Sequence, residues 1–203
     1  MKRYVLIIIA LLCVWQAPGQ RRIPAAVLEN LQGKRYEIHR AFSDSIPVVL
    51  AFWSTACKPC IQELDALSEL YEDWKQMVDF KVVAVAVDDS RTAIKVRPMA
   101  EGREWPFEVL LDKNQDLKRA MNVHSIPFVY VSDKRGNVVY THSGYTPGSE
   151  AGILEAIRNE NGCIRYDYFY SEEDENQLLL VEKWETEECQ RVHMEQPHMH
   201  KLA

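Results

Sequence analysis

Long apolar runs along the chain alternate with segments of helical spacing, and this pattern predicts a layered α/β domain. The runs over 46–53 and 80–87 are rich in β-branched residues, which is typical of strands buried on both faces. Between them, over 60–75, apolar side chains recur three or four positions apart, as on the buried face of a helix. The residues on that face are Leu64, Leu67, Leu70, Tyr71 and Trp74. The sequence therefore predicts a central strand that runs into a long helix.

Shorter elements are predicted around this unit. The segment 27–42, with a turn at Gly33, is interpreted as an opening strand pair or hairpin. Further strands are expected at 109–111, 128–132 and 138–141, and further helices at 91–100, 112–121 and 149–159. Strands that alternate with helices, followed by a terminal hairpin and helix, favour an α/β fold with a central mixed sheet flanked by helices.

Composition limits the class of protein. The chain has 203 residues, of which 47% are apolar and 27% charged, so a packed core can form. These proportions exclude a disordered chain, a collagen-like chain and a multi-pass membrane protein. The net charge of −6 makes a nucleic-acid backbone a poor partner.

The acidic charge is concentrated near the C-terminus, which predicts a second structural unit. Residues 159–203 hold 11 acidic and 4 basic side chains, whereas residues 20–158 hold 19 and 18. In the C-terminal segment, strands are expected at 163–170 and 177–184. Thr186 is a good N-cap for a short helix that begins with two glutamates. We therefore expect a main domain over 20–158 and an acidic appendage over 159–203.

Residues 1–19 have the features of a secretory signal peptide. Lys2 and Arg3 precede an unbroken apolar run over 5–15, which is shorter than the roughly 20 residues that span a bilayer. Small residues then allow cleavage after Gly19. The sequence thus predicts a mature chain in the periplasm or cell envelope, where disulfides form. The alternative is an uncleaved segment that holds the chain beside the membrane.

A pair of cysteines, Cys57 and Cys60, stands where the predicted central strand meets the helix. The N-terminus of a helix presents free N–H groups and a partial positive charge, and both lower the pKa of a cysteine thiol placed there. Lys58 adds a cation, and Pro59 is compatible with the first helical turn. Cys57 is then the attacking thiolate, and Cys60, one turn along, resolves the mixed disulfide with a partner.

A zinc half-site is the alternative interpretation of this C-x-x-C pair. Zinc requires a second pair of cysteine or histidine ligands, and Cys163 and Cys189 do not have that spacing. We therefore favour redox chemistry and expect neither a metal nor a cofactor. Cys163 and Cys189 are expected either to form a second disulfide or to remain two buried thiols.

Pro127 directly precedes the strand expected at 128–132 and is a further candidate site residue. Proline is tolerated at the start of a strand, although it removes one hydrogen-bond donor from the ladder. A cis Ile126–Pro127 bond would bring this backbone beside the cysteine pair, where Ile126 could pair with an incoming peptide as an added strand. An ordinary trans proline is the alternative.

The sequence F-W-S-T-A-C-K-P-C over 52–60 resembles the F-W-x-x-x-C-x-P-C signature of the thioredoxin superfamily. With the predicted signal peptide, the chain is most similar to the TlpA/ResA-like extracytoplasmic thiol–disulfide oxidoreductases. The resemblance extends over about 27–157. It implies a thioredoxin fold in which Cys57 is the nucleophile, Cys60 resolves and Pro127 is cis.

Three residues near the cysteine pair bear on this resemblance. Many members of the family have tryptophan directly before the first cysteine, whereas this chain has Ala56, so the rim of the site is expected to be less apolar. Thioredoxins proper have a buried aspartate at the place of Ala51. Glu63 resembles a glutamate with a proton-handling role in ResA-like proteins, and it lies one helical turn from Cys60. The alternative is that Glu63 is solvated on the helix surface.

The appendage resembles the second half of an antibiotic biosynthesis monooxygenase (ABM) domain, a small ferredoxin-like α+β fold. The matching motifs lie at 160–166, 182–185 and 193–198. Such domains dimerise through their sheets, and some oxidise aromatic substrates without a metal or degrade haem. The first part of the domain is missing, so the half-domain must pack on the main domain, pair with a second copy or remain loose. His193, His198 and His200 are interpreted as solvated residues rather than as haem or metal contacts.

These features predict an extracytoplasmic enzyme that exchanges its Cys57/Cys60 pair with cysteine-containing protein substrates and a redox partner protein. ResA-like relatives reduce apocytochrome or similar targets, so reduction is the expected direction. The alternative is a thioredoxin-fold module that binds partners or forms a homodimer through the appendage. A third candidate, an ABM-type oxygenase, is disfavoured by the missing half of that domain.

Overall fold

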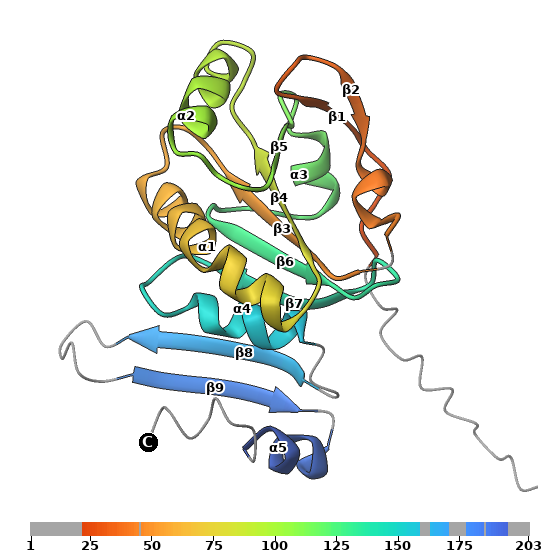
Figure 1. The fold of residues 1–203 in the computed structure, drawn as a ribbon, viewed down its shortest axis with the longest axis vertical. Helices are drawn as coiled ribbons and strands as arrows, with labels where there is room; N and C mark the ends of the chain where they lie inside the picture. Colours follow the sequence, from red (N-terminus) through yellow and green to blue (C-terminus); the bar gives the residue numbers. More distant parts are fainter. Residues whose placement is uncertain (1–21, 45, 159–162, 171–177, 185, 195–203) are drawn as a thin grey trace, which may run out of the picture.

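The computed structural model describes residues 22–44, 46–158, 163–170, 178–184 and 186–194 (Figure 1). A seven-stranded mixed sheet runs through the main domain in the order β2-β1-β5-β4-β3-β6-β7. Its strands are β1 (Val27–Asn30), β2 (Arg35–Glu37), β3 (Val48–Trp53), β4 (Lys81–Ala86), β5 (Glu108–Leu111), β6 (Phe128–Ser132) and β7 (Val138–Ser143). The helices of this domain are η1 (Ile38–Phe42), α1 (Lys58–Met77), η2 (Ala93–Lys95), α2 (Val96–Gly102), α3 (Asp116–Ala120) and α4 (Glu150–Ile157). The predicted α/β fold with a mixed central sheet is confirmed.

Strand β3 is the centre of this sheet. It pairs in parallel with β4 and antiparallel with β6, and all six of its residues are buried. Alternate residues face opposite sides: Val49, Ala51 and Trp53 join one core cluster, and Val48, Leu50 and Phe52 join the other. Burial on both faces explains why this strand is a continuous apolar run rather than an alternating one.

Helices cover both faces of the sheet. The cluster around Trp53 includes Leu64 and Leu67 of α1, Val96 of α2 and Ile153 of α4. The other cluster includes residues of η1 and α3. Helices α1 and α4 pack side by side on the first face (Figure 1). The long helix that begins at the cysteine pair is thus held against the sheet along its length.

Two α-helices begin later than the sequence predicts, and each late start has a local cause. The segment expected as one helix over 91–100 is a 3₁₀ turn followed by α2, which begins at Val96. Pro98 lacks an N–H and is accommodated in the first turn of a helix, so the α-helix begins just before it. The helix expected over 112–121 begins only at Asp116, because Gln115 adopts a left-handed conformation with φ 56°.

The appendage folds as a hairpin and a helix. Strands β8 (Cys163–Tyr170) and β9 (Leu178–Trp184) form an antiparallel sheet of their own, and α5 (Glu187–Met194) follows. Strand β8 lies beside β7 and α4 (Figure 1). Trp184, at the end of β9, packs against the core cluster around Trp53. Of the three arrangements considered for the half-domain, the structure therefore has it packed on the main domain.

Residue Thr186 caps helix α5, as its position predicts. Its Oγ1 accepts a hydrogen bond from the backbone N–H of Cys189 at 3.2 Å. Cys189 is a free thiol, so the second disulfide considered for it is not formed. His193 lies in α5, whereas His198 and His200 are outside the described residues. None of the helices in the described ranges is long and apolar enough to cross a bilayer.

Candidate redox site

The two cysteines of the C-x-x-C pair are joined in a disulfide at the start of α1. Cys57 is the N-cap of the helix, and its Sγ accepts the backbone N–H of Cys60 at 3.3 Å. This places the sulfur at the positive end of the helix dipole, where a thiolate is stabilised. The sulfurs bond to each other, as the redox interpretation of the pair predicts.

The two cysteines differ in exposure, and therefore in whether another protein can reach them. Cys57 is half-buried, with exposed neighbours Ala56 and Lys58 on either side. Cys60 is completely buried and belongs to the core cluster around Trp53. A sulfur atom of another protein can therefore approach Cys57 but not Cys60.

The bond between Ile126 and Pro127 is cis, as the family resemblance implies. Phe128 pairs with Phe52, so Pro127 lies beside the C-terminal end of β3, where the cysteine loop begins. Ile126 is half-buried and contacts both core clusters. The carbonyl oxygen of Pro127 accepts the N–H of Gly144 at 3.0 Å, which ties this turn to the end of β7.

Glu63 is buried in the interior, with 2% of its surface exposed, so the interpretation as a solvated helix residue is wrong. Its Oε1 has no hydrogen-bond partner among the described residues. Burial raises the pKa of the Glu63 carboxyl to about 8, and the negative charge of Glu150 on α4 adds to this rise. A carboxyl group with this pKa can take up or release a proton near neutral pH, one turn from Cys60.

Apolar and aromatic side chains belong to the same core cluster as Cys60. Ala51 is buried in β3, so the aspartate that thioredoxins have at this place is replaced by a methyl group. The indole of Trp53 meets that of Trp105 edge to face, with 5.0 Å between ring centroids. Trp105 in turn donates its Nε1–H to Asp65 of α1 at 2.9 Å. The sequence indicated Trp53 as part of the strand but gave no signal that Trp105 lies beside it.

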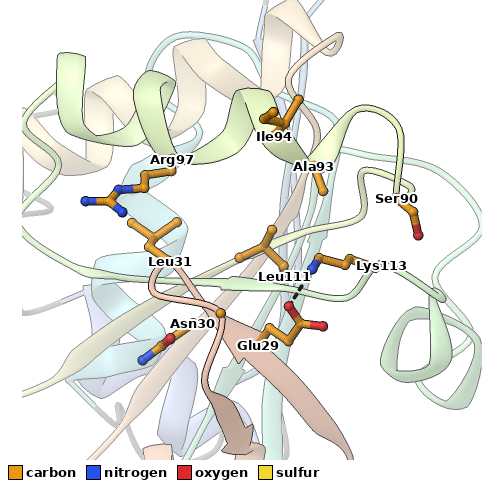
Figure 2. A pocket seen from close by; sticks show the side chains of 10 residues that line it. Glu29, Asn30, Leu31, Ser90, Ala93, Ile94, Arg97, Leu111 and Lys113 are labelled. Atoms are coloured by element: carbon orange, nitrogen blue, oxygen red, sulfur yellow. Dashed lines mark hydrogen bonds and ion pairs between the residues drawn. The ribbon is translucent and has the colours of Figure 1, made fainter.

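A surface pocket of about 370 Å³ lies away from the cysteines (Figure 2). It is lined by the turn after β1, the segment from Ser90 to Arg97 and the end of β5. Lys113 and Glu29 form an ion pair on one side of it, and Leu31 and Leu111 provide apolar surface (Figure 2). No cysteine lines this pocket, so it is separate from the redox site.

Comparison with known proteins gives two family matches that divide the chain. The model of the AhpC/TSA family matches residues 20–141, and the model of the antibiotic biosynthesis monooxygenase family matches residues 151–203. The second match begins inside α4, whose Ile153 and Ile157 are buried in the core of the main domain. Helix α4 thus falls in the second match, although it packs in the core of the main domain.

Individual relatives match the main domain. The thiol-disulfide oxidoreductase ResA of Bacillus thuringiensis is 31% identical over 124 residues, which cover 61% of this chain and 69% of ResA. The thioredoxin-like protein YneN of Bacillus subtilis is 31% identical over 125 residues, which cover 61% of this chain and 71% of YneN. The solution structure of a thioredoxin-like protein from Porphyromonas gingivalis is 43% identical with a TM-score of 0.60, covering 67% of this chain and 89% of that one.

Proposed function

This chain belongs to the AhpC/TSA family and is a thiol–disulfide oxidoreductase of the thioredoxin fold, and we propose that it reduces disulfides of other proteins outside the cytoplasm. The observation that carries the proposal is the asymmetric cysteine pair: Cys57 is accessible at the N-terminus of α1, and Cys60 is buried behind it. Thiol–disulfide exchange needs one sulfur that meets the partner and a second sulfur that only the first can reach.

In the proposed reaction, the Cys57 thiolate attacks one sulfur of a substrate disulfide. A mixed disulfide forms, and the other substrate sulfur leaves as a thiolate. Cys60 then loses its proton and attacks the Sγ of Cys57, which releases the second substrate sulfur and leaves the Cys57–Cys60 disulfide. Two electrons have passed to the substrate, and a redox partner protein must return them to the pair.

Glu63 and Pro127 are proposed to assist these two exchanges. In its ionised form Glu63 would accept the proton of Cys60, since burial makes this carboxylate a stronger base than an ordinary one and it lies one turn away on α1. Pro127 would leave the backbone of Ile126 free to pair with an extended segment of the substrate beside the disulfide. Neither role requires a cofactor.

The proposed location depends on the signal peptide over 1–19, which is outside the described residues. We expect the chain recovered from the cell envelope after export to begin at Gln20. Mass spectrometry of the intact mature protein and N-terminal sequencing measure this directly. A chain that keeps its basic N-terminus and fractionates with the membrane would support the uncleaved anchor, and a chain found with the cytoplasmic proteins would contradict export.

The proposed direction predicts a strongly reducing Cys57/Cys60 pair. We expect its reduction potential to lie near that of thioredoxin, about −270 mV. The measurement equilibrates the purified mature chain in glutathione buffers, or in dithiothreitol buffers at the reducing end, and counts free thiols by alkylation and mass shift. A value near about −120 mV would make the protein an oxidant and contradict the proposed direction.

We further propose that residues 20–158 carry the redox reaction and that the appendage serves a separate purpose. The sheet of β8 and β9 has no third strand in the described part of the chain, so β9 has an edge that can pair with a second copy. This favours a second candidate function, a module that dimerises or binds partners through the appendage.

A further inference from the structure

The loop that carries Cys57 is attached to the neighbouring strand through a buried carboxylate. Asp88 follows β4 and has only 5% of its surface exposed. One of its oxygens accepts the backbone N–H of Thr55 at 2.9 Å, and the other accepts the Thr55 hydroxyl at 2.5 Å. Just before it, the N–H of Val87 donates to the carbonyl oxygen of Trp53 at 2.8 Å. The segment after β4 therefore holds the chain that leaves β3 by three hydrogen bonds, one at Trp53 and two at Thr55.

A hydrogen-bonded turn connects Thr55 directly to Cys57. The N–H of Cys57 donates to the carbonyl oxygen of Ser54 at 3.1 Å and closes a tight turn around Thr55. After this turn Cys57 adopts the extended conformation of an N-cap, and its Sγ accepts the N–H of Cys60. A shift of Thr55 would move the sulfur away from the N–H groups that stabilise a thiolate.

We propose that Asp88 is a positioning residue of the redox site: by holding Thr55 with both carboxylate oxygens, it keeps the Cys57 sulfur over the N-terminus of α1. This inference rests on the proposed function. The contact matters most in the reduced protein, because the disulfide itself restrains Cys57 in the oxidised protein. A residue that is distant in sequence thereby helps to set the reactivity of the attacking thiolate.

Asp112 offers a matched control within the same chain. It directly follows β5 and is buried like Asp88, with 3% of its surface exposed. Its carboxylate also accepts two hydrogen bonds, from the N–H of Leu117 at 3.3 Å and that of Lys118 at 2.8 Å. These bonds hold α3 on the other face of the sheet, and neither of them reaches the cysteine loop.

The test measures the alkylation rate of Cys57 in the fully reduced mature chain at pH 7, resolved at this residue by peptide mass spectrometry. We expect Asp88→Ala to lower the rate about tenfold, because less of the Cys57 thiol is ionised once its sulfur is no longer held at the N-terminus of α1. Asp112→Ala should remain within about twofold of the wild type, although both variants should lower the melting temperature. Equal alkylation rates in the two variants would overturn the proposal.

Thr55 variants keep the proposal testable even where Asp88→Ala fails to fold. Thr55→Ala removes only the hydroxyl bond and should slow alkylation about threefold, whereas Thr55→Ser keeps the bond and should restore the wild-type rate. A wild-type rate in Thr55→Ala would contradict the role of the carboxylate. Because alkylation needs no substrate turnover, a wild type that fails to reduce protein disulfides would refute the proposed function without altering this comparison.

Discussion

Replacing Cys57 with serine should abolish the reduction of protein disulfides. A hydroxyl group at the N-terminus of α1 cannot form a mixed disulfide, so turnover of a model substrate such as insulin should fall by at least about three orders of magnitude. Turnover is followed with a chemical reductant that recharges the pair, and the rate without protein is subtracted. Residual turnover above about one hundredth of the wild type would contradict the role of Cys57.

Replacing Cys60 with serine separates the two steps of the same reaction. Cys57 can still attack, but the mixed disulfide with the substrate cannot be resolved from within the protein. The covalent complex should therefore accumulate and be visible on a non-reducing gel. Cys189→Ser is the matched control, because Cys189 is a free thiol in α5 and its loss should leave turnover within about twofold.

The double variant Cys57→Ala/Cys60→Ala distinguishes the proposed enzyme from the two other candidates. The enzyme loses all turnover in this variant. A binding or dimerisation module would keep its partner or its dimer, measured by sedimentation of the wild type and the variant. An oxygenase that acts through the appendage would still consume oxygen with an aromatic substrate.

Glu63→Gln should remove a pronounced decline in stability with rising pH. The carboxyl has a pKa of about 8 in the folded chain, well above its ordinary value of 4.5. Between these values the folded chain keeps the proton while the unfolded chain has lost it, so stability falls as pH rises and levels off above about 8. In the wild type the free energy of unfolding should thus decrease from pH 5 to pH 9, by up to on the order of 4 kcal/mol.

The measurement is urea unfolding of the oxidised protein at several pH values, so that cysteine titration does not contribute. A glutamine cannot ionise, and Glu63→Gln should therefore be more stable than the wild type at pH 9 and nearly equal to it at pH 5. Glu69→Gln is the control, because Glu69 is exposed on the same helix and its replacement should keep the wild-type decline. A parallel decline in wild type and Glu63→Gln would refute the assignment.

Local sequence patterns predicted the scaffold of the redox site well. The strand expected at 46–53 is β3 and the helix expected at 60–75 is α1, each within two residues of its predicted ends. Apolar periodicity and the capping position of Cys57 are properties of neighbouring residues, so they can be read without knowing the rest of the fold. The late starts of α2 and α3 also have local causes, Pro98 and Gln115, which apolar spacing alone does not register.

The strand, the cysteine pair and the helix that follows could be predicted from local sequence, because each depends on side chains only a few positions apart. The surroundings of that pair depend on the whole fold. Glu63 is buried because α4 packs against α1, and Asp88 reaches Thr55 because β3 and β4 pair in parallel. Such contacts join distant parts of the chain and leave no periodic signal in it. The chemistry of the site therefore depends on contacts that local spacing does not predict.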